Sequence, residues 1–309
     1  MHLCHLFHPL GIRLAIYLAC TAGMLTTVLG NLFVVFSVSY FKVLHTPTNL
    51  LLLSLALADM LLGLLVLPLS TVRSVESCWF FGDFLCHVHT YLDTLFCLTS
   101  IFHLCFISID RYCAICDPLL YPSKFTARVF FLLISWSFPI FFAFGLVCSG
   151  LNVIGAEDFI AGVLASLIAF FIPGTVMVGI YIHIFTVARK HAKQIGTGPR
   201  TKQADSESKM KPTSKAESKA TKTLSILMGV FVVCWVLFFV LTIIDPFIDF
   251  TTPEDLCNVF LWLGYLNSAF NPIIYDMFYP WFCKALRMIA TGKIFSPDSS
   301  TLSMFPAHS

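Results

Sequence analysis

Charged side chains are scarce in this sequence of 309 residues, because only 12% are Asp, Glu, Lys or Arg. A soluble domain carries about twice that fraction. Hydrophobic residues make up 58% of the chain, and the mean hydropathy is +0.85. This composition excludes an ordinary soluble protein and indicates a membrane protein. The net charge of +2 provides no argument for nucleic-acid binding.

Several sequence patterns are also missing. There is no Asn-x-Ser/Thr acceptor, so N-glycosylation is not expected. The twelve cysteines are scattered, and the spacing Cys113–Cys116 has no second pair beside it, which argues against a metal or redox centre. No Lys is expected at membrane depth to hold a covalent cofactor, and the apolar segments show no His/Glu metal spacing and no chain of ionisable groups. These absences argue against a seven-helix transporter or an enzyme.

Seven apolar segments are each long enough to cross about 30 Å of hydrocarbon as a helix. They lie at about 14–40, 48–71, 84–115, 126–149, 160–188, 221–246 and 255–278. An open sheet is excluded because lipid cannot satisfy its edges. The predicted fold is an all-α membrane protein, a seven-transmembrane helix bundle followed by a short amphipathic helix at 279–288. In that helix Trp281 and Phe282 are expected to enter lipid, while Lys284 and Arg287 face phosphates.

Basic residues gather on one side of the predicted bundle, which sets its orientation by the positive-inside rule. The N-terminus (1–13) is therefore expected outside the cell, with no cleavable signal peptide, and the seven-helix domain covers 14–290. A flexible third cytoplasmic loop is expected at 191–222, because this segment is rich in Lys, Ser, Thr and Gly. The tail at 291–309 is expected in the cytoplasm.

Asp93 is a lone carboxylate in an almost uncharged stretch from Phe84 to Ile109. An ionisable side chain at membrane depth costs roughly 2.5 kcal/mol or more and is a functional candidate by default. No Lys or Arg lies near it in sequence, so a removable cation, such as the ammonium group of a small amine, is the favoured partner.

Candidate pocket residues around Asp93 are Cys97, on the same helix face, Ser166 on the fifth helix, and aromatics that could enclose a cation. These aromatics are Trp235, Phe238 and Phe239 on the sixth helix and Trp262 and Tyr265 on the seventh. Two alternatives remain open: a structural carboxylate bonded to Tyr265 or water, and aromatics that only pack the core.

A second polar set is expected deeper in the bundle. It consists of Asp59, Ser100, Asn267, Ser268 and Asn271. Oxygen ligands around one carboxylate suit a hard monovalent cation with waters. A water-filled hydrogen-bond network is the alternative, and no resident cofactor is expected.

Several local motifs occur together and in order along the chain. They are Gly30-Asn31, Leu55-Ala56-Leu57-Ala58-Asp59, Asp110-Arg111-Tyr112, Trp136, Pro173 with Tyr181, Cys234-Trp235, and Asn271-Pro272-Ile273-Ile274-Tyr275. Together they resemble the class A (rhodopsin-like) G-protein-coupled receptors over nearly the whole chain. The run Asn267–Phe282 and the helix-three run Asp93–Cys97 are similar to the trace amine-associated receptors, and the loop Gly196–Gln203 looks most like subtype four.

The resemblance implies a multi-pass receptor of the plasma membrane that binds trace or volatile amines at Asp93. It also implies coupling to a stimulatory heterotrimeric G protein, in many members with an olfactory role. Tyr265 would orient the carboxylate, and the set around Asp59 would be a sodium pocket that favours the inactive state. Asp110, Arg111 and Tyr112 would form an activation switch with Tyr181, Tyr275 and Pro272, the last of which is expected to break the seventh helix.

Two departures from the family pattern stand out. The second outer loop is very short, and 150–163 lacks the family's cysteine, so Cys86 is a disulfide cysteine with an unknown partner; Cys148 and Cys4 are the candidates. Leu237 stands where the family has proline. The alternative function is therefore a receptor-like membrane protein that is impaired in folding or signalling.

Overall fold

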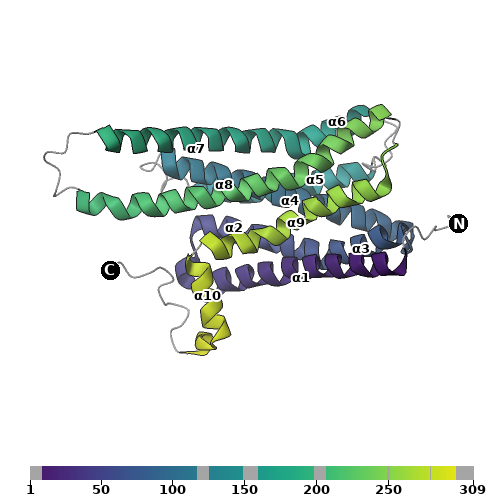
Figure 1. Cartoon of the computed structure of the whole chain (residues 1–309), viewed down its shortest axis with the longest axis horizontal. Coiled ribbons are helices and arrows are strands. Elements are labelled where there is room, and N and C mark those ends of the chain that lie inside the picture. The colour runs from purple at the N-terminus through teal and green to yellow at the C-terminus, as the bar shows by residue number, and fades with distance from the viewer. Residues whose placement is uncertain are drawn as a thin grey trace.

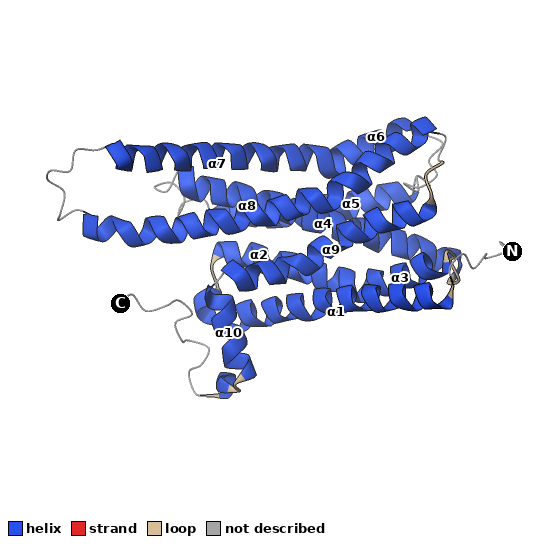
Figure 2. Ribbon diagram, viewed as in Figure 1, coloured by secondary structure: helices blue, strands red, loops and turns tan. Residues whose placement is uncertain are grey.

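The computed structural model describes residues 9–116, 125–148, 159–197, 207–248, 251–278 and 280–296. Every regular element in these ranges is a helix (Figure 2). Seven crossings follow one another along the chain: α1 (Leu10–Tyr40), α2 (Pro47–Leu61) continued through η2 (Leu62–Val66) into α3 (Leu67–Glu76), α4 (Gly82–Cys116), α5 (Phe125–Cys148), α6 (Phe159–Ser166) continued through η4 (Leu167–Phe171) into α7 (Ile172–Thr197), α8 (Glu207–Ile244), and α9 (Glu254–Phe278). Short 3-10 segments lie at η1 (Lys42–Leu44), η5 (Asp245–Ile248) and η6 (Lys293–Phe295), and α10 spans Pro280–Ala290.

The crossings lie side by side along one axis (Figure 1). Among the described residues, six helical spans are long and apolar enough to cross a membrane. The seventh, α9, has 25 residues and is about 37 Å long, but acidic residues at its start and inward-facing amides make it less apolar. The predicted seven-helix membrane bundle is confirmed.

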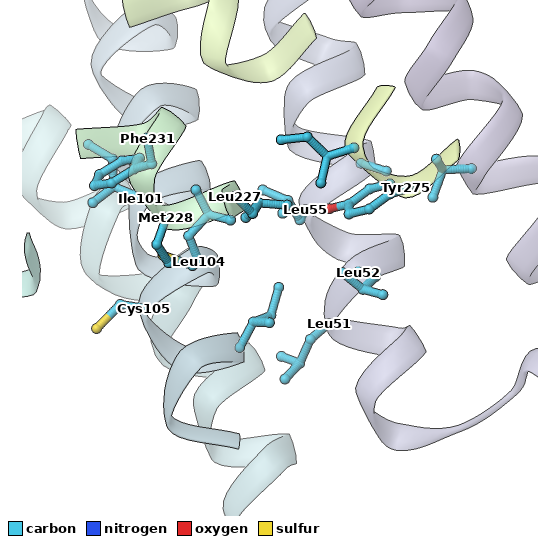
Figure 3. Close-up of a cluster of buried hydrophobic side chains, with 14 of the residues drawn as sticks. Leu51, Leu52, Leu55, Ile101, Leu104, Cys105, Leu227, Met228, Phe231 and Tyr275 are labelled. Carbon is cyan, nitrogen blue, oxygen red and sulfur yellow. The ribbon is translucent and has the colours of Figure 1, made fainter. Parts of the chain in front are cut away.

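The core lies where α2, α4, α8 and α9 meet (Figure 3). Leu55 from α2, Leu104 from α4 and Phe231 from α8 are fully buried there, and Tyr275 from α9 is 1% exposed. Large apolar side chains on the outer faces stay exposed, for example Phe141 and Phe144 on α5. Core and outer surface are thus both apolar, which is the pattern of a bundle surrounded by lipid.

Prolines inside the crossings accompany different local structures. Pro68 follows the π-helical segment η2, and Pro173 follows the π-helical segment η4. A proline ring clashes with the carbonyl four residues earlier, and one wider turn removes that clash. The predicted break at Pro272 is wrong, because α9 continues through this residue.

Two other expectations also need correction. Trp281 and Phe282 are buried in the protein rather than in lipid: they are 3% and 5% exposed, and the Phe282 ring meets Phe33 of α1 edge-on at 4.8 Å. The predicted loop 191–222 is helical over most of its length, since α7 ends at Thr197 and α8 begins at Glu207. Its Ala, Glu and Lys residues are good helix formers, which the loop-like composition concealed. Of the tail at 291–309, residues 297–309 lie outside the described residues, as does most of the N-terminal segment 1–13.

Candidate functional site

Asp93 lies on α4 and is partly exposed. The Tyr265 hydroxyl of α9 donates a hydrogen bond to Asp93 Oδ2 at 2.9 Å, and the Cys97 thiol approaches Oδ1 at 3.4 Å. Among the described residues, no Lys or Arg forms an ion pair with this carboxylate. The charge is therefore held by two neutral donors, and part of its surface remains accessible.

A chain of polar side chains continues behind Tyr265. Its hydroxyl lies 3.5 Å from Ser70 Oγ, which in turn lies 2.9 Å from Nε2 of His89. Ser70 and His89 are both buried, and the His89 ring stands 5.3 Å from Trp79. Sequence reasoning missed Ser70 and His89. The signal that could have found His89 is its spacing, since it lies one helical turn before Asp93.

The expected aromatics divide into two groups. Trp262 meets Tyr265 edge-on at 5.5 Å and donates its indole N–H to Ser74 Oγ at 3.0 Å. Phe238 is partly buried and packs against the cluster that contains Tyr265. Trp262 thus contacts the carboxylate's hydrogen-bond partner directly, and Phe238 packs against the same cluster.

The remaining candidates belong to the core. Trp235 and Phe239 are buried, and Phe239 stacks on Phe170 at 4.7 Å. Trp235 sits so close to α9 that a β-carbon at Gly264 would come within 2.7 Å of its ring, so only glycine fits there. Ser166 on α6 is buried, and among the described residues no hydrogen bond joins it to Asp93.

Asp59 is fully buried and lies at the centre of the second polar set. Ser268 Oγ donates to its Oδ1 at 2.8 Å, and Asn271 Nδ2 donates to its Oδ2 at 2.7 Å. Ser100 and Asn267 are buried as well. The oxygens Asn267 Oδ1 and Asn271 Oδ1 are buried without a hydrogen-bond partner in the described part of the chain. A small cation or water would satisfy such acceptors, so the donor set fits a monovalent hard cation.

At the other end of α4, Arg111 pairs with its neighbour Asp110. Its Nη2 lies 2.5 Å from Asp110 Oδ2, while the Thr48 hydroxyl donates to the same oxygen at 3.0 Å. Arg111 also donates to Thr48. Tyr112 meets His183 of α7 edge-on at 5.4 Å. Of the expected switch tyrosines, Tyr275 lies in the core and Tyr181 packs against it.

Comparisons with known proteins decide the family. The family model described as "7 transmembrane receptor (rhodopsin family)" matches residues 30–275. The chain is 67% identical to trace amine-associated receptor 4 of Mus musculus, over 95% of this chain and 90% of that protein. It is 55% identical to trace amine-associated receptor 5 of Rattus norvegicus (96% and 91% covered) and 47% identical to trace amine-associated receptor 1 of Macaca mulatta (95% and 93% covered).

The chain belongs to the trace amine-associated receptors. It is therefore a multi-pass membrane receptor of class A and not an enzyme, and its identity to the subtype-four protein exceeds that to subtypes five and one. Such similarity along almost the whole receptor does not favour a degenerate copy.

The disulfide expectation for this receptor was wrong. Cys86 is a free thiol, and so is Cys148, whereas Cys78 is disulfide-bonded. Cys86 has no loop cysteine to pair with, since 150–163 contains none. Cys4 lies outside the described residues.

The receptor also has an ion pair at the outer end that sequence reasoning missed. Arg13 at the start of α1 pairs with Glu76 at the end of α3, and the Tyr17 hydroxyl donates to Glu76 at 2.8 Å. The two residues are 63 positions apart, so no local pattern could have indicated the contact.

Proposed function

We propose that this receptor binds small amines, trace or volatile ones in particular, through an ion pair between their ammonium group and Asp93. The partly exposed carboxylate carries the proposal, because its protein partners are two neutral donors. A charge-assisted hydrogen bond from an ammonium group would compensate the charge that the protein leaves unpaired. The similarity to trace amine-associated receptors supports the same ligand class.

Phe238 and Trp262 are the aromatics proposed to enclose the amine's hydrocarbon part. Both are partly buried: Trp262 contacts the Tyr265 ring, and Phe238 packs against the apolar cluster that contains Tyr265. Aromatic faces attract a nearby cation and exclude water from the ion pair. Trp235 lies deeper, and its contact with Gly264 would couple ligand binding to α8.

Signalling is proposed to follow by population shift. An amine that binds one arrangement of α8 and α9 more tightly stabilises that arrangement, and a stimulatory heterotrimeric G protein stabilises the same one from the other side. Release of Arg111 from Asp110 and Thr48 would free its guanidinium for this partner. Sodium held by Asp59, Ser100, Asn267 and Asn271 would favour the resting arrangement. We also propose that the receptor lies in the plasma membrane with its N-terminus outside and that it has an olfactory role.

The test is substitution of the carboxylate in cells that express the receptor. Asp93→Ala should abolish the cAMP response to a panel of alkyl and arylalkyl amines while surface expression stays unchanged. Asp83→Asn is the matched control, because Asp83 is an exposed acid in the first turn of the same helix and should leave the response intact. If the Asp93→Ala variant still responds to the amines with normal potency, the ion-pair proposal is refuted.

A further inference from the structure

His89 is a buried imidazole to which the proposed amine site gives no role. It is 2% exposed and lies on α4, one helical turn before Asp93. Its Nε2 lies 2.9 Å from Ser70 Oγ, and the ring also bonds the backbone carbonyl of Val66. These two hydrogen bonds alone would serve to join α4 to the second crossing. A functional role requires a physical link from the ring to the carboxylate.

Ser70 provides this link, because it lies between His89 and the amine site. The π-helical segment η2 adds one residue to the turn before α3, which rotates the rest of that helix by about 100°. In the first turn of α3, Ser70 is fully buried, and its Oγ lies 3.5 Å from the Tyr265 hydroxyl. That hydroxyl donates to Asp93 at 2.9 Å. A chain of polar groups thus leaves α4, passes through α3 and α9, and returns to α4.

The neutral imidazole leaves this chain interrupted. A neutral ring has one N–H, which the Val66 carbonyl accepts, so Nε2 accepts the hydrogen bond of the Ser70 hydroxyl. Ser70 then has no proton to offer to Tyr265. The 3.5 Å between the two hydroxyl oxygens agrees with this assignment, since a strong hydrogen bond between hydroxyls spans about 2.5–3.0 Å.

A protonated imidazole would complete the chain and reverse one of its bonds. Both ring nitrogens then donate, so Nε2–H points at Ser70 Oγ. The Ser70 hydroxyl becomes free to donate to Tyr265, whose own proton lies on Asp93. Every donor then points toward the carboxylate, and hydrogen bonds in such a series strengthen one another. The carboxylate would in this way gain a positive partner inside the protein.

Two charged groups act on the imidazole from its surroundings. They are the carboxylate of Asp93, on the same helix, and the guanidinium of Arg73, in the last turn of α3. Among the described residues Arg73 has no ion pair, because Glu76, three residues further on, pairs with Arg13. An ammonium ion at Asp93 would cancel the negative charge that compensates a protonated ring, while the charge of Arg73 would remain. A proton on the ring and an ammonium ion therefore compete for one carboxylate.

We propose that His89 is a positioning residue and a proton sensor of the amine site, and that its protonation weakens amine binding at Asp93. The inference rests on the proposed function, because the competition requires an ammonium ion at the carboxylate. Linkage makes the effect reciprocal: a bound amine disfavours the proton on the ring, and a bound proton lowers the amine affinity by the same factor. Histidine changes its charge between about pH 5 and pH 8, so amine affinity should fall as the medium becomes more acidic.

The experiment measures binding of tritiated benzylamine to the purified full chain in detergent, from about pH 8 to about pH 5. A primary ammonium group stays charged over this range, as a lysine side chain with a pKa of about 10.4 does, so the ligand does not titrate. The affinity of the original chain should fall about threefold or more toward the acidic end. His89→Gln keeps an amide that can bond Ser70 but takes up no proton, so its affinity should stay constant.

His87→Gln is the matched control, because His87 is an exposed histidine on the same helix and its loss should leave the pH dependence unchanged. His89→Asn, whose amide can reach the Val66 carbonyl, replaces His89→Gln if the latter does not fold. A constant affinity of the original chain, or an equal pH dependence after loss of His89, would overturn the inference.

Asp93→Ala separates this inference from the proposed function. Benzylamine binding that persists in Asp93→Ala would refute the ion pair and, with it, the competition at the carboxylate. Binding that is lost in Asp93→Ala but does not change with pH in the original chain would refute only the role of His89.

Discussion

Tyr265 donates its hydroxyl to Asp93 across the gap between α9 and α4, at 2.9 Å. The phenol is buried among apolar side chains, so this hydrogen bond fixes the direction in which the carboxylate points. A bond to a charged group contributes about 1.5–3 kcal/mol. Tyr265→Phe is therefore expected to raise the amine concentration for half-maximal cAMP by about ten- to a hundredfold, at unchanged surface expression.

Tyr91→Phe makes the same chemical change on α4, at a tyrosine that has no hydrogen bond to Asp93 among the described residues. It should leave potency unchanged. If the two variants respond alike, the orienting role of Tyr265 is refuted.

Asp59 provides the second prediction, through the unpartnered oxygens that surround it. If sodium occupies this set and favours the resting state, replacing choline by sodium in the buffer should weaken amine binding about fivefold or more. Asp59→Asn keeps the shape but removes the charge, so its amine affinity should no longer depend on sodium. Radioligand competition in membranes measures both. An equal sodium effect in both proteins would favour the alternative of a water-filled network.

The third prediction concerns Cys78 and Cys86, because one is disulfide-bonded and the other is a free thiol. Cys78 is disulfide-bonded, and loss of a disulfide typically costs about 2–4 kcal/mol. Cys86 is a half-buried free thiol, and its replacement should change stability by less than about 0.5 kcal/mol. Cys78→Ser should thus lower the melting temperature of the purified receptor, and Cys86→Ser should not. The reverse order would restore Cys86 as the structural cysteine.

Much of the bundle follows from the sequence, because hydrophobic length alone defines a membrane span. The hydrogen bond between Tyr265 and Asp93 could also be anticipated, since a carboxylate at membrane depth needs polar partners. The burial of Trp281 and Phe282 could not, because an amphipathic pattern does not distinguish a lipid surface from a neighbouring helix.

Other features escaped prediction for different physical reasons. Cysteine spacing does not determine pairing, so Cys78 was missed. A proline signals a disturbed helix but not its form: Pro68 follows a π-helical turn, whereas α9 continues through Pro272. The contact between Arg13 and Glu76 depends on the arrangement of helices, which no local pattern contains.

Leu237 leads to the last prediction, because it lies about two turns before the end of α8, which the structure shows without a break. Its side chain is 42% exposed on the outer face, while Trp235, two residues earlier, is 4% exposed and packs on α9. A proline ring at 237 would point toward lipid and meet no core side chain. It would still remove one backbone hydrogen bond and bend the helix near Trp235.

Leu237→Pro is therefore expected to ease movement of the inner half of α8 and to raise the maximal cAMP response at matched surface expression. Leu237→Ala is the control, since it trims the side chain but keeps the N–H and should leave the maximum unchanged. A bend in a soluble helix costs about 3 kcal/mol, but membrane bundles tolerate proline because neighbouring groups satisfy the freed carbonyl. An unchanged maximum in well-expressed Leu237→Pro would show that bending of α8 does not limit signalling.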